Sequence, residues 1–162
     1  MGGVVVKREL ADAFAGEDYL FSQALTFGGH PVAAAAALKN IQIIERDGLV
    51  DNSAEMGLYL LEGLEELKDK HQSIGHVGGI GLLLGIELVR NHQTKESFPL
   101  EADVERRLKE KFRARRIILV SSSTGVRLSP PLIINRTDAD ELLVILDDVI
   151  DELESELGGI MG

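Results

Sequence analysis

Hydrophobic residues in the first half of the chain recur with the period of a helix. Residues 32–47 (VAAAAALKNIQIIERD) are rich in strong helix formers, with Pro31 at the first turn and Gly48 directly after the last. In residues 52–70 the apolar side chains recur every three or four positions and leave the acidic ones mainly off that stripe. The pattern therefore predicts two successive helices over 32–47 and 52–70.

From Ile74 onward the apolar residues form short runs bounded by glycine or proline, which is typical of strands. The expected strands are 74–79 (IGHVGG), 80–89 (IGLLLGIELV), 117–121 (IILVS) and 126–134 (VRLSPPLII). Pro130 and Pro131 should end the last ladder, because neither residue has an N–H to donate. A helix is predicted over 101–115, and another from Thr137, whose hydroxyl we expect to cap it. This order predicts an α+β fold with a mostly antiparallel sheet covered on one face by helices.

The pattern is less regular before residue 32. Residues 2–6 (GGVVV) predict a buried strand, residues 7–14 a short helix, and residues 25–31 (LTFGGHP) a loop. A strand so near the first residue has no earlier element with which to pair. We therefore expect the chain to begin inside a larger fold.

Composition and charge exclude several classes of function. The 162 residues contain no cysteine, which excludes disulfides, thiolate chemistry and zinc–thiolate sites. The net charge of −10 makes nucleic acid an unfavourable partner, and we interpret the densest acidic run, near the C-terminus, as a solvated helix face. No apolar run approaches the ~18 residues of a membrane span, and the N-terminus does not resemble a secretory signal. A cytoplasmic protein is the expectation.

Two segments carry candidate chemistry. Thr26, followed by two glycines and a predicted helix, could bind a phosphate through its hydroxyl and through backbone N–H groups, although such a loop is more often only a turn. His30 in the same loop is more often a structural hydrogen-bonding residue than a base. Arg127 alternates with Val126 and Leu128 on its strand and therefore faces the opposite side. It could bind a substrate carboxylate in bidentate fashion or pair with a carboxylate of its own chain.

The remaining histidines do not indicate a metal centre. His71, His76 and His92 show no metal-ligand spacing with one another, and His76 falls inside a strand pattern. No metal site is therefore predicted.

Four stretches in a fixed order resemble one family across essentially the whole chain. They are residues 1–14 (MGGVVVKRELADAF), 26–57 (TFGGHPVAAAAALKNIQIIERDGLVDNSAEMG), 78–89 (GGIGLLLGIELV) and 125–143 (GVRLSPPLIINRTDADELL). The chain resembles the C-terminal part of the class III, or omega, aminotransferases, which are pyridoxal-phosphate-dependent enzymes of fold type I. The resemblance implies transfer of an amino group from an amine or amino acid donor to a keto acid acceptor.

The resemblance also implies a domain division and site residues. Residues 1–47 would be a remnant of the large cofactor-binding domain with the interdomain helix, and residues 48–162 the small C-terminal α/β domain. Thr26 would bind the cofactor phosphate of the partner subunit in a homodimer, and Phe27 would line the same pocket. Arg127 would receive the substrate carboxylate.

The chain departs from the family pattern in ways that bear on activity. The lysine that holds the cofactor as a Schiff base would lie shortly before the segment matching Met1. That lysine, the aspartate for the pyridinium nitrogen and the aromatic residue that stacks on the ring are absent, and Lys7 matches no catalytic position. Gly78 stands where the family often has Arg. The resemblance thus implies no catalytic residue here and an inactive isolated chain. The alternatives are a non-catalytic association module and a related aminomutase or racemase.

Overall fold

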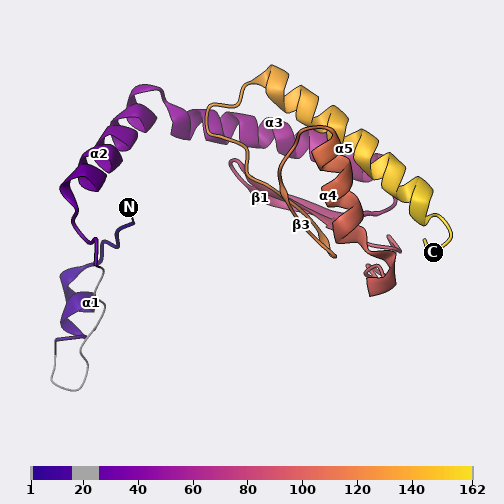
Figure 1. Ribbon diagram of the computed structural model, residues 1–162, viewed down its shortest axis with the longest axis horizontal. Coiled ribbons are helices and arrows are strands. Elements are labelled where there is room, and N and C mark those ends of the chain that lie inside the picture. Colours follow the sequence, from indigo (N-terminus) through magenta and orange to yellow (C-terminus); the bar gives the residue numbers. More distant parts are fainter. Residues whose placement is uncertain (1, 16–25, 162) are drawn as a thin grey trace. The chain divides into compact units, whose positions relative to one another are not determined.

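A computed structural model describes residues 2–15 and 26–161. The chain divides into two compact units, Met1–Asp47 and Gly48–Gly162, which are described separately (Figure 1).

The described residues of the first unit form two helices, α1 (Arg8–Asp12) and α2 (Pro31–Arg46), and neither has a buried residue. Residues 26–29 form the turn before α2, as predicted, whereas residue 25 lies outside the described part of the chain. The strand predicted over residues 2–6 is wrong, because this segment is irregular and Val5 is 98% exposed. A strand requires a neighbouring strand to bond with, and the described residues of this unit offer none.

The second unit is an α+β domain, as the pattern predicted. Its elements follow in the order α3 (Leu49–Lys70), β1 (Ile74–Ile80), β2 (Leu83–Leu88), the 3-10 turn η1 (Leu100–Ala102), α4 (Val104–Ala114), β3 (Val120–Ser122), β4 (Gly125–Leu128) and α5 (Arg136–Leu157). The four strands form one antiparallel sheet in the order β1-β2-β4-β3. Each helix is bounded within a few residues of the expected position.

The core lies between the sheet and helices α3, α4 and α5, which cover one face of the sheet (Figure 1). Its fully buried side chains are almost all aliphatic, as a chain without Trp requires, and include Leu60, Leu64, Leu108, Phe112, Leu146, Ile150 and Leu153. The strands alternate in burial, so every second side chain leaves this core for the other face, which we call the outer face. None of the described helices of this unit covers the outer face.

Several predicted boundaries need correction, among them the start of β3, which begins at Val120 rather than at residue 117. Helix α5 begins at Arg136 and is capped by Asn135 rather than Thr137, because the Asn135 side chain accepts from the Asp138 N–H while Asp138 accepts from the Asn135 N–H. This reciprocal pair places the cap three residues before Asp138 and leaves Thr137 inside the first turn. Strand β4 ends at Leu128, so the ladder stops just before Pro130 and Pro131, as predicted, and the extended run to residue 134 is not part of the strand.

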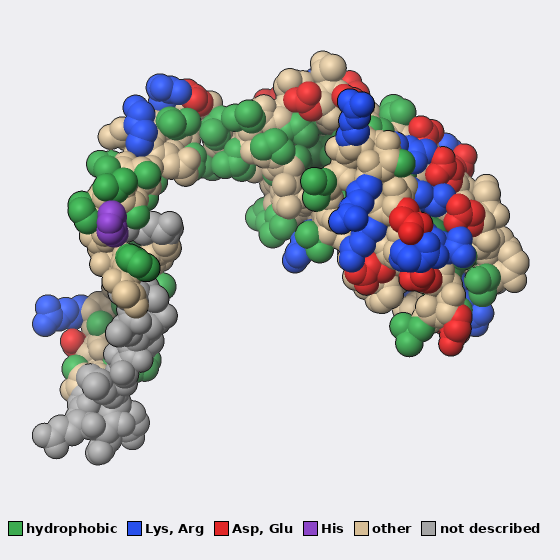
Figure 2. Space-filling view, in the orientation of Figure 1, with side chains coloured by type: hydrophobic (Ala, Val, Ile, Leu, Met, Phe, Trp, Pro, Cys, Tyr) green, Lys and Arg blue, Asp and Glu red, His purple; other side chains and the backbone are tan. Residues whose placement is uncertain are grey.

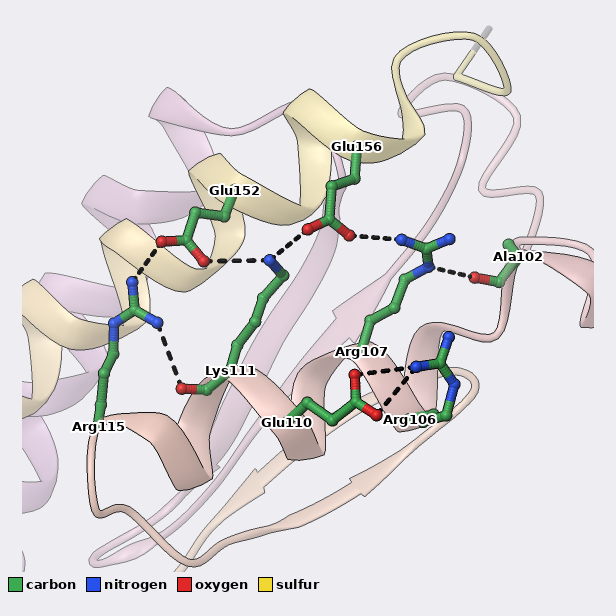
Figure 3. A network of polar contacts seen from close by, with 8 residues as sticks. All are labelled: Ala102, Arg106, Arg107, Glu110, Lys111, Arg115, Glu152 and Glu156. Carbon is green, nitrogen blue, oxygen red and sulfur yellow. Dashed lines mark hydrogen bonds and ion pairs between the residues drawn. The ribbon is translucent and has the colours of Figure 1, made fainter.

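The acidic run on α5 does not form a simply solvated face. Glu152 contacts Arg115 at 2.5 Å and Lys111 at 3.1 Å, and Glu156 contacts Lys111 at 2.6 Å and Arg107 at 2.5 Å (Figure 3). These pairs join α5 to α4, and basic and acidic side chains alternate over this part of the surface (Figure 2). Hydrogen bonds from Arg115 and then Lys111 lower the pKa of Glu152, and those from Lys111 and then Arg107 lower the pKa of Glu156.

Candidate active site

Arg127 lies on the outer face of the sheet, as its alternation with Val126 and Leu128 predicted. Val126 and Leu128 are buried, whereas Arg127 is exposed. In the strand register Arg127 stands opposite Gly85 on one side and Val120 on the other, and Gly85 stands opposite Gly78. The row across the sheet is therefore glycine, glycine, arginine and valine.

The two glycines leave open space beside the guanidinium. A Cβ atom added at Gly85 would meet only the Val126 carbonyl oxygen, at 3.8 Å. One added at Gly78 would meet only the His76 ring, at 3.1 Å from Nε2. These residues line a groove of roughly 720 Å³ along the outer face, together with polar side chains that include Glu87, Ser122 and Thr124.

Arg127 makes no side-chain hydrogen bond or ion pair to any residue of the described chain. Glu87, the acidic residue in the neighbouring row, pairs in register with Gly125 and forms no ion pair with the guanidinium. The internal ion pair considered from the sequence is therefore not formed within this unit. A guanidinium presented in this way retains its full set of donors, and two of them fit the two oxygens of a carboxylate.

Backbone geometry positions the arginine's strand. Gly125 has φ +152°, and a Cβ there would lie 2.0 Å from the Ile86 carbonyl oxygen, so only glycine lets β4 approach β2 at this point. After the strand, the Asn52 side chain donates to the Leu132 and Ile134 carbonyl oxygens at 2.7 and 3.0 Å. The sequence pattern identified Asn52 only as the expected first residue of a helix, because its partners lie 80 and 82 positions away.

The second predicted element, the Thr26 turn, belongs to the first unit. Thr26 and Phe27 are both exposed, Phe27 at 80%, and Gly29 adopts φ +70° before α2 begins. His30 is the N-cap residue of α2 but gives no side-chain cap, and Pro31 occupies the first helical position.

The N-terminus of α2 suits an anion. The first helical hydrogen bond runs from the Ala34 N–H to the His30 carbonyl, so the N–H groups of Val32 and Ala33 have no partner within the helix. With the Thr26 hydroxyl nearby in sequence, these donors are the kind that bind phosphate oxygens. The described residues of this unit therefore fit the phosphate end of a cofactor.

From the sequence, His71 was considered only with His76 and His92, with which it has no metal-ligand spacing. It is 1% exposed, and its ring nitrogens face carboxylates of α5, with Nε2 at 2.6 Å from Asp147 and Nδ1 at 3.3 Å from Glu154. Within the described chain it groups with Asp151 and Glu154 rather than with His76 or His92. The carboxylates lie about 80 positions downstream, so no local spacing could reveal the cluster.

Comparison with solved structures places this fold among the transaminases. The chain is similar to an (S)-enantioselective omega-transaminase from Thermomicrobium roseum, with a TM-score of 0.83 and 36% identity over 91% of this chain and 33% of that one. The aminotransferase class-III family model matches residues 1–150, and the chain belongs to this family. Class III aminotransferases use pyridoxal phosphate, so the predicted family and cofactor are confirmed at this level.

Curated relatives extend over several reactions. The chain is 37% identical to a taurine–pyruvate aminotransferase of Bilophila wadsworthia over 87% of this chain and 32% of the relative. It is 32% identical to an isoleucine 2-epimerase of Lentilactobacillus buchneri over 96% of this chain and 33% of the relative. The chain thus spans about a third of the length of the curated relatives it matches. No helix in the described residues is long and apolar enough to cross a bilayer.

Proposed function

We propose that this chain supplies two binding elements of a pyridoxal-phosphate-dependent aminotransferase and does not catalyse amino transfer by itself. Arg127 binds the carboxylate of the amino acid or keto acid substrate. Thr26 and the first turn of α2 bind the phosphate of the cofactor, and Phe27 lines the same pocket. The single observation that carries the proposal is that Arg127, on the outer face, has no side-chain partner within the described residues and lies beside Gly85 and Gly78, which leave open space next to it.

The two elements bind different groups, one the cofactor phosphate and the other the substrate carboxylate. The Thr26 hydroxyl and the N–H groups of Val32 and Ala33 offset the phosphate charge, which the positive end of the helix dipole also favours. The guanidinium of Arg127 orients the substrate through two parallel hydrogen bonds. Pyridoxal phosphate, when bound, supplies the electron sink that stabilises negative charge on the reacting carbon. A partner subunit in a homodimer, the domain division at residue 47 and a cytoplasmic location remain predictions.

A chimeric enzyme tests the role of Arg127. In the chimera, the 162 residues of this chain replace the matching third of the Thermomicrobium roseum transaminase. The assay follows transfer of the amino group from an amine to pyruvate. Arg127→Gln should raise the KM for pyruvate about tenfold to a hundredfold, since a hydrogen bond to a charged group contributes about 1.5–3 kcal/mol. The KM for an amine without a carboxylate should stay unchanged.

Arg113→Gln is the matched control, because Arg113 is an exposed arginine on α4, away from the outer face. Equal effects of the two substitutions on both KM values would refute the carboxylate role. For the isolated chain, borohydride reduction with pyridoxal phosphate should yield no adduct at a unique lysine. A stoichiometric adduct at Lys7 would refute the proposed inactivity.

Two other functions have an observation in their favour. The similarity to isoleucine 2-epimerase supports a racemase, which would exchange the α-proton of an amino acid with solvent deuterium without consuming a keto acid.

An association module is supported by the exposed apolar side chains of the first unit, which include Val4, Val5, Leu10, Phe14, Val32, Leu38 and Ile41. Light scattering of the purified chain at micromolar concentration distinguishes this function, since a stable monomer contradicts it.

A further inference from the structure

His71 closes the C-terminus of α3 and is enclosed by three carboxylates of α5. Its Nε2 lies 2.6 Å from Asp147 Oδ1, and its Nδ1 lies 3.3 Å from Glu154 Oε2 and 3.8 Å from Asp151 Oδ1. The ring is 1% exposed, so its polar atoms depend on these neighbours rather than on water. The cluster lies in the second unit, away from the outer face.

Asp147 lies behind the ring. Both of its oxygens accept from Lys70 Nζ at 2.7 Å, and its Oδ1 lies 2.6 Å from His71 Nε2. The other ring nitrogen, Nδ1, faces Glu154 and Asp151. One imidazole nitrogen and two carboxylate oxygens therefore converge on the same side of the ring.

The spacing of these atoms suits a small divalent metal ion. The ligand atoms of His71, Asp151 and Glu154 all lie within 4.8 Å of one another. Tetrahedral bonds of about 2.0–2.2 Å place donors roughly 3.3–3.6 Å apart, and the Nδ1 to Glu154 distance of 3.3 Å already matches this. The Nδ1 to Asp151 Oδ1 distance of 3.8 Å must shorten by a few tenths of an ångström. Its side chain is 68% exposed and has room to rotate.

The groups behind the ligands are also arranged as in metal sites. Asp147 holds the far nitrogen of the imidazole, and the Ser73 N–H donates to the other oxygen of Glu154 at 2.7 Å. A carboxylate behind a histidine ligand, and a hydrogen bond behind a carboxylate ligand, are the usual means of fixing ligand orientation. The Ser73 hydroxyl is buried and without a hydrogen-bond partner beside this cluster. Two of the three ligands are thus held in place by other residues.

We propose that His71 Nδ1, Asp151 and Glu154 bind one divalent transition-metal ion such as Zn²⁺, with Asp147 and the Ser73 backbone as orienting groups. One imidazole with two carboxylates is a donor set that suits zinc and its neighbours. Lys70 donates to both oxygens of Asp147 and offsets its charge, and the pocket beside His71 is also lined by Lys68, Asp69 and Arg90. The bound ion joins the end of α3 to α5 and leaves a fourth position for water.

Calorimetric titration of the purified, untagged chain with Zn²⁺ tests the proposal. One ion should bind per chain, and Co²⁺ bound in its place should give visible absorption with nitrogen and oxygen ligands. Asp151→Asn should weaken Zn²⁺ binding at least tenfold, since it removes an exposed ligand at no cost to the core. Asp147→Asn, which alters only the orienting group, should weaken binding by about 10–100-fold.

Asp148→Asn is the matched control, because it makes the same charge change on α5 at an exposed residue outside the ligand group. Its affinity for Zn²⁺ should stay within twofold of the unmodified chain. Absence of saturable binding up to millimolar Zn²⁺ would overturn the proposal. Equal weakening by Asp151→Asn and Asp148→Asn would overturn it as well.

Discussion

Gly57 lies where α3 touches the turn between β1 and β2, and replacing it with Ala should destabilise the second unit. A Cβ at this position would lie 2.3, 2.4 and 2.6 Å from the O, C and Cα atoms of Gly81. All three are backbone atoms. The turn cannot move away freely, because the Leu82 N–H donates to Ser53 Oγ on the same helix.

Two opposing contributions determine how much Gly57→Ala changes the free energy of unfolding. Replacing glycine by alanine inside a helix stabilises it by about 0.8–1.0 kcal/mol. Against this, the shortest contact lies about 1 Å inside an ordinary van der Waals distance, and overpacking of this kind costs about 1–3 kcal/mol or more. Because rigid backbone forms the obstacle, we expect the upper part of that range and a net loss of about 1–2 kcal/mol.

Gly63→Ala on the same helix is the control. There the added Cβ would meet Leu143 Cδ1 at 2.4 Å, but this atom ends a flexible, half-buried side chain that can change rotamer. The helix gain should then dominate or cancel the cost, giving a change between zero and about 1 kcal/mol of added stability.

Urea unfolding followed by circular dichroism measures both variants. With a slope of about 1–3 kcal/mol per molar urea, a separation of roughly 2 kcal/mol moves the two midpoints about 1 M apart. If Gly57→Ala is as stable as Gly63→Ala, the close approach of α3 to the turn is wrong and so is the reasoning from it.

Two further predictions concern α5. Because the pKa values of Glu152 and Glu156 are lowered on folding, their ion pairs stabilise the fold above the ordinary glutamate value of 4.5 and lose that contribution as pH falls through the lowered values. Replacing both with Gln should lower the urea midpoint at pH 7 but much less at about pH 3, and an equal loss at both would contradict this. Asn135→Ala should cost about 0.5–2 kcal/mol by removing the cap, whereas Thr137→Ala, assayed beside it, should cost less.

The periodicity of the sequence was sufficient to predict the second unit. Local features, namely helical stripes, glycine-bounded apolar runs and Pro130–Pro131, determine where its elements lie. The prediction for residues 2–6 was wrong because a β-branched run specifies a strand only when another strand is available. The choice of Asn135 over Thr137 as cap was missed, since it depends on which side chain completes a reciprocal pair.

Site residues could be predicted only where a local sequence pattern indicated the position of the side chain. Strand alternation was enough to place Arg127 on the exposed face. The placement of Gly85 and Gly78 beside Arg127 depends on the register between β1, β2 and β4, which no single segment of the sequence determines. The same is true of His71, whose partners are set by the packing of α3 against α5 and lie 76 to 83 positions away.

Arg127 has no acidic partner in the part of the chain that the structure describes, and this affects how the protein should be handled. A positive charge without a protein counter-ion attracts small anions from solution, and two-oxygen anions such as acetate resemble the proposed carboxylate most closely. If Arg127 binds a substrate carboxylate as proposed, affinities measured in acetate or phosphate buffers will therefore be underestimated. Buffers of weakly coordinating anions at low ionic strength are the proper reference state.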